Sequence, residues 1–207
     1  MPRGMRASGS RSGRSRSGRS PSEPAASDPE ARARQICLRL LTAAPRTRAE
    51  LAAALSRRGV PGEAAEAVLG RFTDVGLIDD AAFARAWVES RHYSRGLSRR
   101  SLSAELRQHG VEAEEIREAV STLDPEQEVA TARRLVEQRM AGTRGQPPEA
   151  RIRRAAGTLA RKGYPPGLVF RLISEVLEQE GSGEAAGLEL DPDQYADPDA
   201  DPDDAIG

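Results

Sequence analysis

The feature that most constrains this chain is an internal repeat marked by three glycines. Gly59, Gly110 and Gly163 stand 51 and 53 residues apart, and each directly follows a basic residue or a histidine. A leucine precedes each glycine by four residues, which is about one helical turn. This pattern is typical of a helix that ends at a glycine in a left-handed conformation, with positive charge near the negative end of the helix dipole.

A second helix is predicted after each glycine. Apolar residues follow each glycine by six, ten and thirteen positions in all three copies, and steps of four and three residues place them on one helical face. They are Ala65, Leu69 and Phe72; Ile116, Val120 and Leu123; and Val169, Ile173 and Val176. Pro61 and Pro165 suit the first turn of such helices, where the N–H group that proline lacks would have no partner anyway.

A third helical segment precedes each pair of helices. The three segments cover about residues 30–43, 80–93 and 125–140. Asp79 is predicted to cap the second of these segments, with Ile78 contacting Phe83 across the cap. Each copy of the repeat is therefore predicted to be a unit of three helices.

The predicted fold class is all-α, as an elongated tandem array of three three-helix modules. The modules are expected at residues 28–78, 79–123 and 124–182. A module of this size has a small core, so neighbouring modules are expected to support one another. No alternating run of apolar and polar residues indicates a strand.

The two ends of the chain differ from its middle in composition. Residues 1–27 contain six arginines and one acidic residue, whereas residues 183–207 contain nine acidic residues and no basic one. Both segments lack the apolar residues needed for a core and are predicted to be disordered. The net charge of −1 hides a charge of about +3 on residues 28–182, which favours polyanions or acidic protein surfaces as partners.

Nothing in the sequence indicates an active site. The chain has no Gly-rich loop ending in Lys-Ser or Lys-Thr, no His-Glu-x-x-His motif and a single cysteine, Cys37. His92 and His109 are expected at helix ends, either solvated or interacting with the helix dipole. We therefore expect no enzyme activity, no catalytic residue, no metal and no cofactor. The lone cysteine and the lack of a long apolar run predict a cytoplasmic protein without membrane contact.

Arginines of the second and third modules are the candidate partner-binding residues. They are Arg91, Arg95, Arg99, Arg100, Arg107, Arg151 and Arg154. Such arginines can contact an acidic protein surface or phosphate, but Glu89 and Glu105 lie among them, so a solvated helix face is an equal alternative for each one. Phe83 and Trp87 stand four residues apart on an apolar stripe and are expected in the core instead of in a base-stacking platform.

One segment of the second module resembles the RecX family, whose members modulate the bacterial RecA recombinase. The segment is Ile78-Asp79-Asp80-Ala81-Ala82-Phe83-Ala84, and it is followed by Gly96, Arg99, Leu102, Glu105, Leu106 and Gly110-Val111. The resemblance extends over about residues 30–178 and is most specific in the second module.

The resemblance implies a non-enzymatic regulator whose curved array lies in the helical groove of the RecA–DNA filament. Such a protein is expected to inhibit the ATPase and strand-exchange activities of the filament in recombination, DNA repair and the SOS response. It is expected to be a monomer, with single- or double-stranded DNA as a second partner. Two other interpretations stay open: a helical DNA-binding protein acting directly on nucleic acid, since helix-turn-helix units also have short turns, and an adaptor for an unrelated protein.

Overall fold

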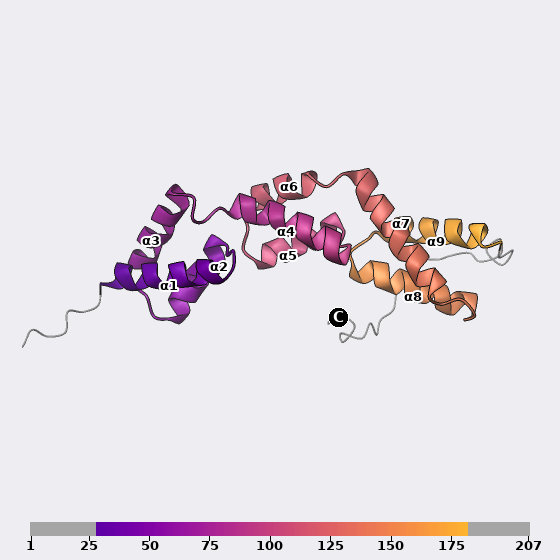
Figure 1. Ribbon diagram of the computed structural model, residues 1–207, viewed down its shortest axis with the longest axis horizontal. Helices are drawn as coiled ribbons and strands as arrows, with labels where there is room; N and C mark the ends of the chain where they lie inside the picture. The colour runs from indigo at the N-terminus through magenta and orange to yellow at the C-terminus, as the bar shows by residue number, and fades with distance from the viewer. Residues whose placement is uncertain (1–27, 182–207) are drawn as a thin grey trace, which may run out of the picture.

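The structure is a computed structural model that describes residues 28–181. Within this range the chain forms nine helices and no strand, arranged in an elongated row (Figure 1). The helices are α1 (Pro29–Ala43), α2 (Arg48–Arg57), α3 (Gly62–Asp74), α4 (Asp80–Arg95), α5 (Arg99–Gln108), α6 (Ala113–Ser121), α7 (Pro125–Ala141), α8 (Pro148–Arg161) and α9 (Pro166–Gln179). The predicted all-α tandem array is confirmed. The predicted disorder of residues 1–27 and 183–207 falls outside the described residues.

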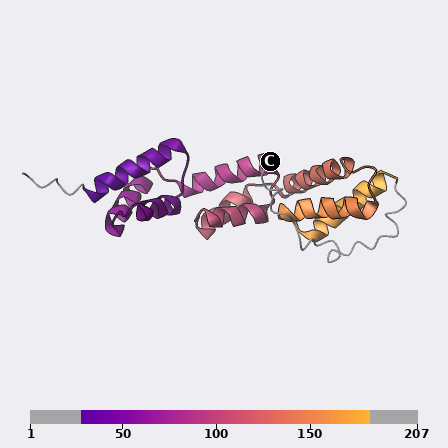
Figure 2. The same cartoon turned by 90° about the horizontal axis from the view of Figure 1, so that it is seen from below.

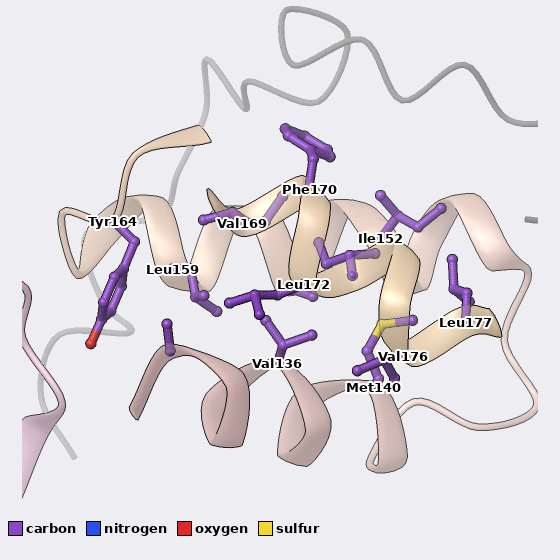
Figure 3. Close-up of a cluster of buried hydrophobic side chains, with 14 residues drawn as sticks. Val136, Met140, Ile152, Leu159, Tyr164, Val169, Phe170, Leu172, Val176 and Leu177 are labelled. Atoms are coloured by element: carbon purple, nitrogen blue, oxygen red, sulfur yellow. The ribbon is translucent and has the colours of Figure 1, made fainter. Parts of the chain in front are cut away.

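Three consecutive helices form each module (Figure 2). Each module has a core of its own. Module 1 consists of α1 to α3, module 2 of α4 to α6 and module 3 of α7 to α9. The core of module 3 contains fourteen buried residues, with Met140, Tyr164 and Phe170 among them (Figure 3), whereas the core of module 2 contains eight. With eleven buried residues in the core of module 1, the core of the middle module is the smallest of the three, so we expect module 2 to depend most on its neighbours.

The glycine turns have the conformation expected from the repeat. Gly59, Gly110 and Gly163 have φ angles of 67°, 75° and 82°, in the left-handed region that favours glycine. After each glycine, the next residue donates its N–H group to the leucine carbonyl five positions back. These bonds run from Val60 to Leu55 (3.2 Å), from Val111 to Leu106 (3.1 Å) and from Tyr164 to Leu159 (3.1 Å). Each turn therefore ends one helix and anchors the start of the next segment to the core of its module.

The chain passes from module 1 to module 2 at Ile78 and Asp79. Asp79 caps α4 as predicted, since its carboxylate accepts a hydrogen bond from the N–H group of Ala82 at 2.7 Å. The predicted contact between Ile78 and Phe83 is wrong, because Ile78 is buried in the core of module 1 while Phe83 packs against the core of module 2. Ile78 closes the first module, and the cap at Asp79 opens the second.

Candidate partner-binding surface

Modules 1 and 2 meet where the first turn of α2 contacts the turn between α5 and α6. The Thr47 hydroxyl donates to the carbonyl of His109 at 2.6 Å. A carbon atom added at Gly110 would lie 2.4 Å from Cβ of Ala49, so the two backbones approach as closely as a glycine allows. We call this contact junction 1–2; it comprises residues 46–50, Asp80 and residues 108–110.

Asp80 holds the first turn of α2 from the neighbouring module. Its carboxylate accepts from the N–H group of Arg48 at 2.9 Å, an N–H group that has no partner within its own helix. Burial raises the pKa of Asp80, and the hydrogen bond from Arg48 opposes that shift. Asp79 and Asp80 thus cap two different helices.

The same type of contact recurs between modules 2 and 3, where the first turn of α5 meets the turn between α8 and α9. The Ser98 N–H group donates to the carbonyl of Lys162 at 2.9 Å. The buried Tyr164 hydroxyl donates to the carbonyl of Gly96 at 3.0 Å, and burial raises the pKa of Tyr164 well above its usual range. We call this contact junction 2–3; it comprises His92, residues 95–101, Glu128, Thr131 and residues 161–164.

His92 is a buried link in junction 2–3. Its side chain lies 2.9 Å from the Leu97 carbonyl through Nδ1 and 3.1 Å from the Thr131 hydroxyl through Nε2. Because a carbonyl only accepts, Nδ1 carries a proton and donates it to Leu97, while Nε2 and the Thr131 hydroxyl share the second hydrogen bond. His92 lies in the last turn of α4, as expected, but the alternative of a solvated side chain is wrong, since His92 is only 6 % exposed.

His109 belongs to junction 1–2, where it is partly exposed. Its Nδ1 lies 2.8 Å from a carboxylate oxygen of Glu50 in module 1, and its ring meets the Trp87 ring edge-on at 4.3 Å. Trp87 also stacks with Phe83 at 5.5 Å. Both aromatic residues pack against the core of module 2, in agreement with their expected core position. The sequence repeat could have indicated that His109 lies at a junction, because His109 directly precedes its glycine just as Lys162 precedes Gly163.

The predicted arginines fall into different environments. Arg95, Arg100, Arg107 and Arg154 are exposed, and Arg154 donates to the side chain of Gln146. Arg91 is half-buried, with its guanidinium 4.2 Å from the centre of the Trp87 ring.

Two of the predicted arginines serve the fold. Arg99 pairs with Glu128 at 3.5 Å and donates to the carbonyl of Leu123, so it joins modules 2 and 3. Arg151 is 8 % exposed, and its guanidinium donates to Glu180 at 2.6 Å inside module 3. The pattern of α8 places Arg151 on the surface, but the structure turns this side chain inward, where it meets the last turn of α9. It is therefore unavailable to a partner.

Junction 2–3 also gathers positive charge from two distant parts of the sequence. Arg95 is the last residue of α4, Arg161 is the last residue of α8, and Lys162 follows it. The ammonium group of Lys162 donates to the carbonyl of Arg95 at 2.5 Å. Burial lowers the pKa of Lys162, and the nearby charges of Arg95 and Arg161 lower it further. We call these three side chains the junction cluster.

A cleft of about 410 Å³ opens at junction 1–2. Its wall comes from α2 and from the turn between α5 and α6, and its lining includes Arg46, Arg57 and Arg58 with Glu50 as the one acidic side chain. The cleft beside junction 1–2 is therefore lined mainly by basic side chains among its charged residues.

Residues 28–181 contain no group of three or more histidine, cysteine or acidic side chains placed to hold a metal ion. Over the same residues, every helix is too short or too polar to cross a membrane.

Comparison with known proteins gives the same division into modules. Family profiles described as the first, second and third three-helix domains of RecX match residues 33–72, 79–120 and 126–173. The regulatory protein RecX of Thermobifida fusca is 62 % identical over 151 residues, which are 73 % of this chain and 82 % of that protein. The regulatory protein RecX of Streptomyces coelicolor is 60 % identical over 149 residues, 72 % of this chain and 79 % of that one.

Solved structures of RecX proteins have the same fold as this chain. A crystal structure of regulatory protein RecX superposes with a TM-score of 0.63 at 26 % identity, covering 72 % of each chain. A crystal structure of RecX from Lactobacillus salivarius has a TM-score of 0.65 over 72 % of this chain and 97 % of that one; its 17 % identity supports the fold alone. Profiles for all three domains and relatives at 60 % identity or more lead to one conclusion: this chain belongs to the RecX family of regulatory proteins.

Proposed function

We propose that this protein binds the RecA–DNA filament and inhibits its ATPase and strand-exchange activities, and so regulates recombination, DNA repair and the SOS response. In this role it acts as a monomer in the cytoplasm, by binding and without catalysing a reaction. A RecX regulatory role follows from the family; the target and the direction of the effect are our proposal.

The observation that carries the proposal is the repeated junction contact. At both junctions a glycine turn packs on the first turn of a helix, and hydrogen bonds of 2.6 to 3.0 Å join the modules. The three modules therefore form one long body (Figure 1). A filament presents the same surface at regular intervals, so a long body can make several weak contacts at once, and their combination yields high avidity.

Exposed arginines supply the contact surface in this proposal. Arg95, Arg100 and Arg107 line the end of α4 and the length of α5, and Arg154 extends the positive charge onto α8. Exposed charges of this kind steer association and set its register more than they add affinity. Binding is therefore expected to weaken as salt concentration rises.

The direct test is DNA-stimulated ATP hydrolysis by the cognate recombinase on single-stranded DNA, with increasing amounts of this protein. We expect hydrolysis to fall to a low plateau and the protein to sediment with the filaments. Unchanged hydrolysis at saturating protein would contradict inhibition. Absence of this protein from the filament pellet would contradict filament binding itself. Equally tight binding to DNA without recombinase, with a steep salt dependence, would favour direct action on nucleic acid.

Charge reversal tests the arginine surface. The double variant Arg100→Glu/Arg107→Glu changes two exposed side chains, so helicity should stay constant while inhibition weakens at least several-fold. The matched control is Arg34→Glu/Arg39→Glu, which makes the same change of charge on exposed positions of α1. An equal loss in both double variants would show that net charge acts, and not the surface on α5.

A further inference from the structure

The cleft at junction 1–2 combines a floor of small apolar side chains with basic side chains at both ends. Its floor is the face of α2 that carries Ala49, Ala53 and Arg57, which stand four residues apart and therefore lie on one side of the helix. Arg46 stands just before the first turn of α2, and Arg57 is the last residue of that helix. Residues 108–110 of module 2 complete the lining. An occupant of the cleft would therefore contact both modules.

The charged side chains around this floor are mainly positive. Arg46, Arg57 and Arg58 line the cleft, and Glu50 is the one acidic side chain of the lining. Glu50 is already engaged, since its carboxylate lies 2.8 Å from Nδ1 of His109 and 3.7 Å from the guanidinium of Arg46. Arg57 is exposed, and no carboxylate within residues 28–181 pairs with it. Because a cleft lined by charges of one sign concentrates their field, it favours an anionic occupant.

The mixture of apolar and basic lining fits a protein segment better than a nucleic acid. A phosphodiester strand carries a negative charge on every nucleotide, so some of its charges would face Glu50 and the alanines of the floor. A protein segment can place small side chains there and carboxylates at the two ends, where guanidinium groups bind carboxylates through paired hydrogen bonds. The exposed amide of Gln108 lies in the same lining and can bond a peptide backbone.

The length of α2 determines the spacing that suits such carboxylates. The helix has ten residues, which corresponds to about 15 Å. An extended segment advances about 3.3 Å per residue, so its residues i and i+4 lie about 13 Å apart and point to the same side. This spacing matches the two ends of α2, because the long arginine side chains can bridge the small difference.

We propose that the cleft at junction 1–2 binds an extended acidic segment of a partner protein, with carboxylates at positions i and i+4 held by Arg46 at one end and by Arg57 and Arg58 at the other. Small side chains between the two carboxylates lie over Ala49 and Ala53. The binding itself requires only this chain and the segment; that the segment belongs to the recombinase filament rests on the proposed function.

Fluorescent peptides test the cleft directly. The probe is a short peptide of alanines and serines with glutamates at positions i and i+4; one control has glutamines at those positions, and the other has two adjacent glutamates. With the full chain at low salt, fluorescence anisotropy should show saturable binding of the probe that is about three- to tenfold tighter than binding of either control. Trp87, the only tryptophan, lies against His109 of the lining and should change its emission as the cleft fills. Equal binding of the three peptides, or no saturable binding of the probe, would overturn the proposal.

Two substitutions with opposite effects locate the bound peptide. Arg57→Glu reverses an exposed charge and should weaken binding of the probe by about five- to tenfold, whereas Arg34→Glu makes the same change on α1 outside the lining and should leave binding almost unchanged. Glu50→Gln removes the one negative charge of the lining and should tighten binding by about two- to threefold. Its control is Glu178→Gln, at an exposed position of α9. If each variant and its control change the affinity equally, net charge and not the cleft determines binding, and the proposal is wrong.

A single-stranded oligonucleotide tests the choice of partner class. We expect a short oligothymidylate with the same net charge as the probe to bind more weakly than the probe and to leave it in the cleft. Displacement of the probe by lower concentrations of the oligonucleotide, with loss of that effect in Arg57→Glu, would make the cleft a nucleic-acid site and contradict a protein segment.

Sedimentation with recombinase filaments tests the source of the segment. If the segment belongs to the filament, Arg57→Glu should weaken co-sedimentation several-fold while Arg34→Glu does not. Wild-type co-sedimentation of an Arg57→Glu variant that no longer binds the probe would exclude the filament as the source of the segment. Absence of filament binding by the unchanged chain, with the peptide still bound, would instead contradict the proposed function.

Discussion

Junction 1–2 and junction 2–3 have the same architecture but are held by different chemistry. In both, a glycine turn of one module packs on the first turn of a helix in the preceding module. Junction 2–3 adds a backbone hydrogen bond, a buried tyrosine and a buried histidine. Junction 1–2 combines the hydrogen bonds of Thr47 and Asp80 with a partly exposed pair, His109 with Glu50, beside an open cleft.

This difference indicates that the row of modules is not equally stiff along its length. Buried hydrogen bonds leave unsatisfied groups when they break, and exposed ion pairs exchange their partners for water at little cost. We therefore expect modules 2 and 3 to behave as one unit, and module 1 to change its orientation more readily. Such a joint would let a long body adapt to a curved surface.

The largest effect is expected from Gly110→Ala, which acts at junction 1–2. The new methyl group would lie 2.4 Å from Cβ of Ala49 at a φ of 75°, so strain and overpacking together should lower the free energy of unfolding by about 2 to 5 kcal/mol. Gly59→Ala is the control, because Gly59 has a similar φ and open space around it; it should cost about 1 to 2 kcal/mol. Chemical unfolding followed by circular dichroism measures both.

A rescue variant separates the two causes of that loss. Adding Ala49→Gly to Gly110→Ala removes the opposing methyl group, so part of the stability should return. If the single variants Gly59→Ala and Gly110→Ala lose equal stability, the close approach at junction 1–2 contributes nothing and the backbone conformation explains everything.

The next effect compares the two histidines. His92→Ala leaves the Leu97 carbonyl and the Thr131 hydroxyl without their partner and opens a cavity, so it should destabilise the protein by about 2 to 4 kcal/mol. His109→Ala removes a partly exposed pair and an edge-on ring contact, for which we expect about 1 kcal/mol. Losses of the same size in thermal unfolding would contradict the distinction between a buried and an exposed junction.

Tyr164→Phe removes one hydroxyl and leaves the Gly96 carbonyl unpaired, which should cost about 1 to 2 kcal/mol. The pKa of Tyr164 is raised in the folded protein, so the unfolded chain loses this proton first. The contribution of the Tyr164 hydroxyl to stability is therefore fully present below pH 10, the ordinary pKa of tyrosine, and declines as the pH rises above that value. The variant should lack that part of the alkaline decline; identical pH profiles of unfolding would exclude a buried hydroxyl at this junction.

The smallest effect is expected from Glu50→Gln. The side chain of Glu50 is 23 % exposed and faces His109 at 2.8 Å, so losing its charge should cost below about 1 kcal/mol, and the loss should shrink in high salt. Trp87, the only tryptophan, lies against His109 and reports the change by fluorescence. A loss that persists at high salt would mean that junction 1–2 is more rigid than we infer.

The local structure was largely predictable from sequence. The three glycines and the leucines four residues before them take their expected places, and so do the apolar positions after them, except that Leu123 is buried beyond the end of α6. Asp79 caps its helix as its position predicts. These features depend on the 3.6-residue helical period and on the conformational freedom of glycine, and both act within about a dozen residues.

The contacts between modules were not predictable in the same way. Asp80 reaches the first turn of α2, Lys162 reaches the end of α4, and Arg99 pairs with Glu128. Arg151 shows the same limit inside one module, since it pairs with Glu180 although its helix pattern resembles an exposed stripe. Each partner lies about 30 or more residues away, and periodicity carries no information about which distant surface a side chain will meet.

The sequence by itself determined that this protein is a threefold repeat of helices, because each repeat must bury its own apolar face at the helical period. Only the tertiary structure decided which polar residues join the modules and which stay free for a partner. The physical reason is that helix formation is decided by neighbours along the chain, whereas the role of His92, Arg99 or Lys162 depends on how one finished module stacks on the next.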